Sequence, residues 1–172
     1  MPVDALDTRI VQLFHDEPRI GVLEASRRLG VARGTVQARL DRMTRTGVIA
    51  GWGPELDPAA LGYDVTAFAT LELRQGVGHD VVARHLADIP EVIEAHTITG
   101  SADMLVRLVA RSNADLQRVI DTVLAHDGIV RTSTVIALAT QVPRRMLPLL
   151  AKAAQEGRGA RTAPRDVTEI GP

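Results

Sequence analysis

Residues 22–47 read VLEASRRLGVARGTVQARLDRMTRTG and contain two helical patterns separated by a break of three residues. The first pattern ends at Leu29. The second begins at Arg33 and repeats apolar residues at helical spacing, namely Val36, Leu40 and Met43. Gly30 suits the left-handed conformation that ends a helix and turns the chain sharply. A short helix, a glycine turn and a second helix predict a helix-turn-helix.

The face of the second helix opposite its apolar residues is basic. Residues 27–45 carry six arginines and one acid, a net charge of +5, in a chain whose net charge is −1. Guanidinium groups match phosphate oxygens and guanine edges with paired hydrogen bonds. An isolated basic helix is as often a solvated surface, but the preceding helix and turn favour binding to double-stranded DNA. We therefore expect DNA contacts from Arg27, Arg28, Arg33, Gly34, Thr35, Gln37, Ala38, Arg39, Arg42 and Arg45.

These residues are expected to divide between bases and phosphates. Phosphate contacts position a protein on DNA, and contacts to base edges give specificity. The expected base-reading residues are Arg33, Gln37, Ala38 and Arg42, and the expected phosphate-binding residues are Arg27, Arg28 and Arg45. Ala32, just before the reading helix, offers no side-chain oxygen to cap it, which costs about 1 kcal/mol.

Composition limits the class of protein. With 45% hydrophobic residues, 2% aromatic residues and no cysteine among 172 residues, the chain fits a soluble protein with aliphatic cores and without disulfides. The five histidines show no metal-ligand spacing, and neither a phosphate loop nor a catalytic triad order occurs, so we expect no metal, no cofactor and no enzymatic activity. No signal peptide or membrane-spanning run is evident, so the expected location is the cytoplasm, on the nucleoid.

The N-terminal region is predicted to form a winged helix-turn-helix domain over residues 1–53. Asp4 or Asp7 can cap a first helix that ends before Pro18. Residues 48–53 are expected to form a short strand. Residues 54–64 read as a linker with one helical turn near residues 58–61.

Beyond the linker the pattern changes to alternating strands and helices. Strands are expected at 65–74, 92–99, 104–111 and 129–138, with helices at 81–89 and after a cap at Ser112 or Asn113. This βαββαβ order predicts a ferredoxin-like sandwich over residues 65–142 and an α+β fold overall. Its open sheet face favours pairing with a second copy. Residues 143–172 are expected to form a helix at 144–156 and a disordered tail.

Several of these segments together resemble the Lrp/AsnC (feast/famine) bacterial transcription regulators, over about residues 4–142. The resemblance is carried by LDTRIVQLFHDEPRI, EASRRLGVARGTVQARLDRMTRTGVIAGW, LDPAALGY, IPEVIEAHTITGSADMLVRLVAR and HDGIVRTSTVIAL. It implies DNA binding by the N-terminal domain and a homodimer that assembles to tetramers or octamers. It also implies an amino acid or a related small molecule bound between sensing domains.

The resemblance also points to an effector site. Gly100 and Asp103 match the glycine and second acid of the family's Gly-Asp-aromatic-Asp turn, whereas Ser101 and Ala102 replace the acid and the aromatic residue. Hydroxyl residues on the second and fourth strands, expected to be neighbours, complete the set. The expected effector-binding residues are Thr97, Thr99, Gly100, Ser101, Asp103 and Thr134, with Thr132 and Ser133 nearby.

Two alternatives stay open. Arginine content and oligomerisation also fit a nucleoid-type protein that organises DNA with little sequence preference. The two-domain architecture further resembles the sirohaem decarboxylases, which are enzymes of a tetrapyrrole. For that activity His96 and Arg107 are the candidate residues on the sheet.

Overall fold

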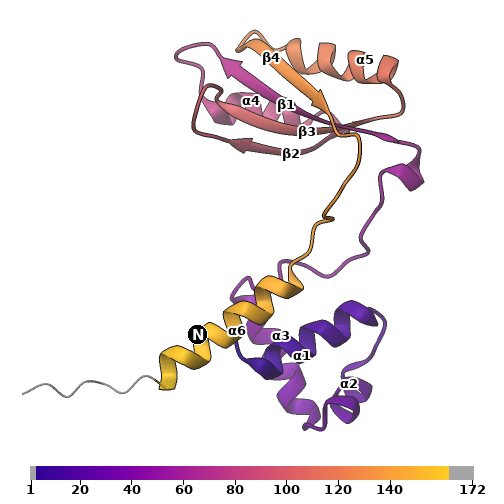
Figure 1. The fold of residues 1–172 in the computed structure, drawn as a ribbon, viewed down its shortest axis with the longest axis vertical. Helices are drawn as coiled ribbons and strands as arrows, with labels where there is room; N and C mark the ends of the chain where they lie inside the picture. Colours follow the sequence, from indigo (N-terminus) through magenta and orange to yellow (C-terminus); the bar gives the residue numbers. More distant parts are fainter. Residues whose placement is uncertain (1–2, 163–172) are drawn as a thin grey trace, which may run out of the picture. The chain divides into compact units, whose positions relative to one another are not determined.

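The computed structural model describes residues 3–162, with side chains to residue 157. The chain folds into two compact units (Figure 1). One combines the residues up to Gly53 with those from Pro143 onward, and the other consists of Pro54–Val142. The C-terminal helix therefore belongs to the same unit as the helix-turn-helix.

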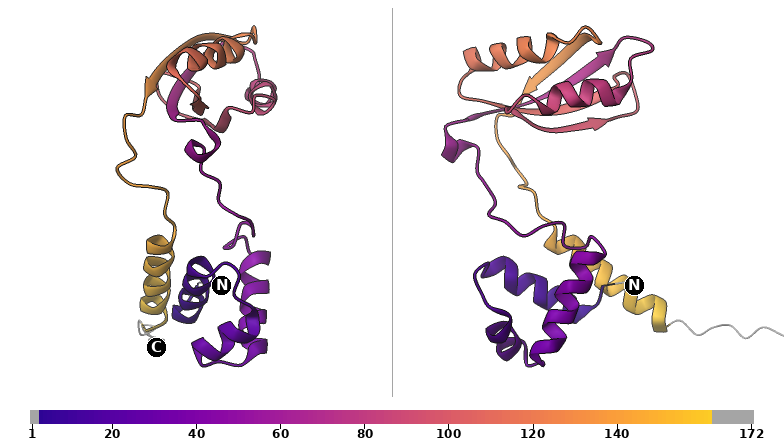
Figure 2. Two further views of the ribbon diagram at one scale, coloured as in Figure 1. Left: turned by 90° about the vertical axis from the view of Figure 1, so that its right-hand side faces the viewer. Right: turned by 180° about the vertical axis from the view of Figure 1, so that it is seen from behind.

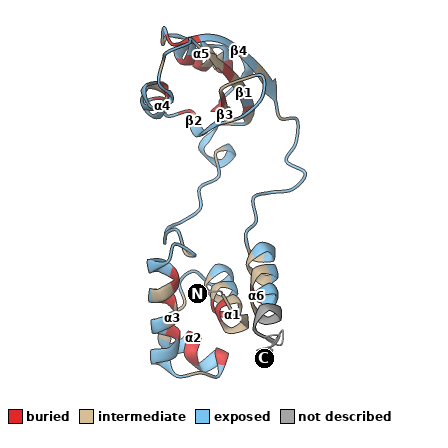
Figure 3. Ribbon diagram, turned by 90° about the vertical axis from the view of Figure 1, so that its left-hand side faces the viewer, coloured by how far each residue is buried: buried red, intermediate tan, exposed pale blue. Residues whose placement is uncertain are grey.

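Four helices make up the described part of the first unit: α1 (Ala5–Asp16), α2 (Val22–Leu29), α3 (Arg33–Arg45) and α6 (Leu147–Thr162). The first three enclose an aliphatic core, and the buried residues gather where these helices meet (Figure 3). The core residues are Ile10, Ala25, Leu29, Val36, Leu40 and Met43. The predicted apolar stripe of the second helix in the motif is thus confirmed.

The helix ends follow local chemistry. The Asp4 side chain accepts hydrogen bonds from the backbone N–H groups of Leu6 and Asp7, and the Asp7 carboxylate accepts one from the Asp4 N–H, which completes a capping box. Gly30 has φ 69°, the left-handed conformation that the sequence predicted for the turn. Ala32 precedes α3 without a side-chain cap, also as predicted.

Two expectations for this unit are wrong. Residues 48–53 form no strand, since the described part of the unit contains only helices, and an isolated strand has no ladder of hydrogen bonds to hold it. Trp52 instead packs edge-on against Phe14, with ring centroids 5.7 Å apart. The C-terminal helix does not end at residue 156 but continues to Thr162. The rest of the expected tail, residues 163–172, lies outside the described residues.

The second unit is a four-stranded antiparallel sheet with helices packed on one face (Figure 2). A 3-10 turn (Ala59–Leu61) leads into β1 (Val65–Leu73), α4 (His79–Ala87), β2 (Val92–Thr97), β3 (Met104–Ala110), α5 (Asn113–Leu124) and β4 (Ile129–Ile136). The strand order is β2-β3-β1-β4, so the ferredoxin-like prediction is confirmed. Core residues include Ala69, Leu71, Val82, Val106 and Val119.

The strand order contradicts one expectation about the sheet. β2 and β4 are not neighbours but its two outer edges, because β3 and β1 lie between them. In a βαββαβ fold each edge strand pairs with one central strand, β2 with β3 and β4 with β1. Thr97 on β2 and Thr134 on β4 therefore lie at opposite edges of the sheet.

Candidate nucleic-acid interface and effector site

The outward face of α3 presents a compact set of exposed residues. The α3 core residues occupy one side of the helix, and the residues exposed on the other are Arg33, Gly34, Thr35, Gln37, Ala38 and Arg45. Small residues in the middle of this set allow close approach of a ligand to the backbone, while the arginines stand near its two ends. Gln37 Nε2 donates to Asp41 Oδ1 at 2.8 Å, so one acid also lies on this face.

The two α2 arginines are exposed and paired with acids of the same surface. Arg28 forms ion pairs with Glu17 and with Glu24, and its Nε lies 3.2 Å from Glu24 Oε1. The hydrogen bond to Glu17 raises the pKa of Arg28. Arg27 lies 3.6 Å from Glu24. Pairs this exposed contribute little to stability, so both guanidinium groups are accessible to a polyanion.

Arg39 and Arg42 do not lie on the outward face with the other α3 residues that were expected to contact DNA. Arg39 Nη1 lies 2.7 Å from Asp4 Oδ1 and 2.9 Å from Asp7 Oδ1. Arg42 Nη2 lies 2.5 Å from Asp7 Oδ2. Their side chains are only 25% and 21% exposed. Both arginines lie on the side of α3 that faces α1, where they pair with acids instead of reaching solvent.

This Asp4–Asp7–Arg39–Arg42 network (the α1–α3 network) has a clear electrostatic signature. Burial raises the pKa of the Asp4 carboxyl, but the hydrogen bonds from Arg39 and from backbone N–H groups outweigh it, and the net pKa lies below the ordinary value of 3.8. The hydrogen bond to Asp4 raises the pKa of Arg39. Asp4 and Arg39 are therefore both charged near neutral pH, and the ion pairs of the network join α3 to α1.

One feature of the sequence indicates this network, although the net charge of residues 27–45 does not reveal it. Asp7 is fully buried and stands on the same side of α1 as Ile10 and Phe14, at spacings of three and seven. An acid at a position of the apolar repeat is costly unless it is paired. Such an acid therefore indicates that some of the arginines form ion pairs with it in the folded protein.

The predicted effector turn is well defined by its backbone. Gly100 has φ 123°, a conformation that favours glycine, and the Ile98 N–H donates to the Asp103 carbonyl at 3.0 Å. The Asp103 carboxylate accepts a hydrogen bond at 2.7 Å from the backbone N–H of Leu73, at the end of β1. Thr97, Thr99 and Ser101 are exposed around this turn. The structure thus brings these three hydroxyls to one end of the sheet. At the same end, the hydrogen bond from Leu73 to the Asp103 carboxylate ties the turn to β1.

Thr134 does not join this group. It lies opposite Ala69 on the helix-covered face of β4, and its Oγ1 is buried and makes no hydrogen bond among the described residues. Thr132 is placed in the same way, opposite Leu71, while Ser133 faces the open side opposite Thr70. The expected grouping of Thr134 with the effector turn is therefore wrong, because β4 and β2 are the two opposite edges of the sheet.

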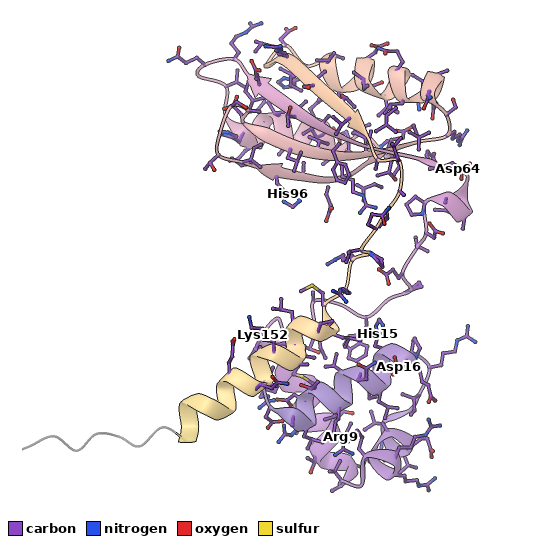
Figure 4. All side chains as sticks on the ribbon, in the orientation of Figure 1. Arg9, His15, Asp16, Asp64, His96 and Lys152 are labelled. Atoms are coloured by element: carbon purple, nitrogen blue, oxygen red, sulfur yellow. The ribbon has the colours of Figure 1, made fainter. Side chains whose placement is uncertain are left out.

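The residues proposed for the alternative enzymatic activity lie on the open face of the sheet. His96, labelled in Figure 4, is on β2 opposite Leu105, and Arg107 is opposite Glu94. Arg107 Nη1 lies 3.9 Å from Glu94 Oε2, so a carboxylate already balances its charge. Within residues 3–162 no group of three potential metal ligands comes together, and none of the helices is long and apolar enough to cross a membrane.

Comparison with protein families covers both units. Residues 3–44 match the AsnC-type helix-turn-helix domain, and residues 66–147 match the Lrp/AsnC ligand binding domain. The first match contains α1, α2 and nearly all of α3. The second contains the sheet except for Val65, the first residue of β1, and ends at the first residue of α6.

Individual proteins agree with these matches. The chain is 30% identical over 149 residues to HTH-type transcriptional regulator FL11 of Pyrococcus horikoshii, covering 87% of this chain and 98% of that protein. It is 30% identical over 147 residues to regulatory protein AsnC of Escherichia coli K12, covering 85% and 97%.

Two solved structures show the same fold. The structure of Escherichia coli AsnC has a TM-score of 0.78 at 29% identity and covers 86% of this chain and 100% of that chain. A transcriptional regulator from Neisseria meningitidis, solved as a complex with L-methionine, has a TM-score of 0.76 at 23% identity, with 86% and 97% covered. The second likeness concerns the fold alone.

Proposed function

The chain belongs to the Lrp/AsnC family of transcription regulators, and on this premise we propose which of its residues read DNA and how its sensing domain acts. The observation that carries the proposal is the exposed face of α3. This face carries Arg33, Gln37, Ala38 and Arg45. On another side of the helix, the α1–α3 network joins α3 to α1. This arrangement fits a recognition helix in the major groove of DNA.

The roles on this face follow from position. Gln37 and Ala38 lie in the middle of the exposed side, where Gln37 can pair with adenine and Ala38 can contact a thymine methyl group. Arg33 at the start of α3 can bind guanine. Arg27 and Arg28, on the preceding helix, hold phosphates. Because Arg39 and Arg42 are engaged with α1, specificity rests on the first two turns of α3.

The sensing domain supplies the second copy that a palindromic site needs. The open face of its sheet carries three apolar side chains, Phe68 on β1, Leu105 on β3 and Val135 on the edge strand β4, and Val135 is 63% exposed. Two ion pairs lie on the same face, Glu72 with Arg131 and Glu94 with Arg107, and Arg107 is opposite Phe68. Exposed apolar side chains on one open sheet face favour burial against a second copy of the chain. A homodimer formed there, which assembles further to tetramers or octamers, presents two recognition helices to successive major grooves about 34 Å apart.

The effector is an amino acid or a related metabolite, bound at the turn that follows β2. Gly100 shapes the bend, and the hydroxyls of Thr97, Thr99 and Ser101 are free to donate to a carboxylate. With the family's acid and aromatic residue replaced by Ser101 and Ala102, the ligand differs from those that need both groups. Binding at an interface of sensing domains shifts the subunits and, with them, the recognition helices. The protein acts in the cytoplasm, on nucleoid DNA.

Fluorescence anisotropy with the DNA upstream of the protein's own gene and with scrambled DNA of the same length tests the DNA assignment. A specific regulator binds the upstream DNA at least about a thousand-fold more tightly. Equal affinity for both at every salt concentration supports the nucleoid-type alternative instead. Sirohaem added to the protein, followed by absorbance, tests the enzymatic alternative, and an unchanged spectrum argues against it.

A thermal-shift panel of the twenty amino acids tests the effector assignment. A ligand present at a hundred times its dissociation constant adds about 2.7 kcal/mol to the free energy of unfolding. The ligand that shifts the melting temperature is then added to the anisotropy titration, where it must change the affinity for upstream DNA. If no amino acid shifts the transition while DNA binding is intact, the effector assignment fails and the DNA assignment stands.

A further inference from the structure

Helix α6 lies along α1 in the unit that carries the helix-turn-helix (Figures 1 and 2). Between the two helices runs a groove of about 290 Å³, lined by Ala5, Thr8, Arg9, Ala151, Ala154 and Gln155. Four of these side chains are small, which lets the two helices approach closely. Ala154 is only 4% exposed. The contact therefore buries the middle of α6.

The sequence of α6 is organised for this contact. Leu147, Leu150, Ala151 and Ala154 repeat at helical spacing, and all four are buried or half-buried. Residues on the opposite side are exposed, Leu149 at 58% and the Lys152 side chain at 71% (Figure 4). One apolar stripe faces α1, as in any helix that packs on a core.

The docking site of α6 is linked to the turn of the helix-turn-helix. Arg9, which lines the groove, extends its Nη2 to the backbone carbonyl of Leu29 at 3.2 Å. Leu29 is the last residue of α2 and precedes Gly30, the turn before the recognition helix. A cation that binds the final carbonyls stabilises a helix end. Arg9 is exposed, but α6 borders the groove that Arg9 lines, so α6 limits the rotamers of this side chain and thereby supports the α2–α3 turn.

The two family matches do not extend into α6 beyond its first residue. The match to the Lrp/AsnC ligand binding domain ends at residue 147, the first residue of α6. Escherichia coli AsnC is covered in full by 86% of this chain. The contacts of α6 with α1 therefore cannot be explained by the two matched domains.

We propose that α6 is an intramolecular brace, which docks on the Ala5–Thr8–Arg9 face of α1 in the same chain and supports the turn before the recognition helix. Because β4 leads through residues 137–146 into α6, docking also gives the DNA-reading unit a second covalent connection to the sensing domain, besides residues 54–64. Two connections leave the unit fewer orientations than one, which reduces the entropy lost on binding DNA. Only this last step rests on the proposed function.

Cross-linking tests the docking without reference to DNA. The chain has no cysteine, so Thr8→Cys combined with Ala151→Cys introduces the only two thiols, both lining the groove. A short thiol cross-linker is expected to join them within one chain, as seen by mass spectrometry and on a non-reducing gel. The matched control, Thr8→Cys with Lys152→Cys, places the second thiol on the exposed side and is expected to cross-link at least ten-fold less. Cross-links between chains, or equal yields for both pairs, overturn the brace.

Hydrogen exchange and DNA binding test what the brace does. Ala154→Glu places a charge in the buried contact, whereas Lys152→Glu changes an exposed residue of the same helix. In the full chain, Ala154→Glu is expected to speed amide exchange in α1 and at Gly30 at least ten-fold and to weaken binding of upstream DNA at least five-fold, with Lys152→Glu unchanged in both. Unchanged exchange overturns docking, and faster exchange with unchanged DNA affinity overturns the support of the reading unit. If wild-type protein binds no DNA specifically, the proposed function fails while the cross-linking result still decides docking.

Discussion

Arg42 Nη2 on the recognition helix lies 2.5 Å from Asp7 Oδ2 on the first helix, and the Asp7 side chain is fully buried. Arg39 binds the other oxygen of the same carboxylate at 2.9 Å. Two of the six arginines in residues 27–45 thus join the recognition helix to α1, and the proposed DNA contacts are left to the other four. A substitution at Arg42 therefore acts on folding before it acts on DNA.

Arg42→Ala is expected to lower the free energy of unfolding by about 1–3 kcal/mol, because it removes a partner from a buried carboxylate. Urea denaturation measures the change. The matched control is Arg45→Ala, an exposed arginine three positions later on the same helix, for which we expect a change within about 0.5 kcal/mol. Equal stability of the two variants would show that Asp7 does not depend on Arg42.

Arg33→Ala is expected to weaken DNA binding without lowering stability, in contrast to Arg42→Ala. Arg33 is exposed at the start of α3, and loss of a bidentate base contact costs about 1–3 kcal/mol of binding free energy. Anisotropy titrations with upstream DNA at one fixed salt concentration measure the loss, and urea denaturation should show unchanged stability. A variant that binds like the wild type removes Arg33 from the interface.

Ala32→Ser is expected to stabilise the DNA-reading unit. Ala32 has φ −62° and ψ 144°, the extended conformation in which a serine oxygen accepts from the backbone N–H two or three residues later. The gain should be about 0.5–1 kcal/mol in thermal or urea unfolding. Ala38→Ser, inside the same helix, serves as the control and should give no gain, because alanine is the better helix former. A loss of stability at position 32 contradicts the assignment of Ala32 as an open cap.

The α1–α3 network predicts the acid sensitivity of this unit. The pKa of Asp4 in the folded protein lies below 3.8, so its contribution is fully present well above that pH and is lost as the pH falls through the folded-state pKa. Asp4→Asn keeps a capping side chain but removes the charge that pairs with Arg39. The stability difference between wild type and variant is therefore expected to be largest near pH 6 and to shrink below about pH 4. Unfolding measured at both pH values checks this, and a constant difference would rule out a charge effect.

Thr134→Val tests whether Thr134, on the edge strand β4, takes part in effector binding. The buried Thr134 hydroxyl makes no hydrogen bond among the described residues, and an unpaired buried hydroxyl costs about 1–3 kcal/mol. The variant is expected to be at least as stable as the wild type and to keep its thermal shift with the effector. Ser133→Ala, on the open face of the same strand, is the control and should leave stability nearly unchanged. Loss of the effector response in Thr134→Val would return this residue to the binding site.

Local patterns in the sequence were enough for most of the secondary structure. The spacing of Val36, Leu40 and Met43 and the glycine at position 30 predict the helix-turn-helix, because both depend on interactions within a few residues. The alternation of strands and helices after residue 64 predicts the ferredoxin-like order for the same reason. The strand expected at 48–53 failed because a strand depends on a partner, which local sequence does not supply.

Tertiary structure alone decided which charged and hydroxyl residues are available for function. The sequence placed Arg39 and Arg42 with the other arginines of the second helix, but a buried acid far away in the sequence, Asp7, binds both. Likewise, the strand order separates Thr134 from Thr97, although both are threonines of strands in one sheet. Helical and strand periodicity are local and can be read along the chain, whereas the partner of a charge and the neighbour of a strand are fixed only when distant segments pack.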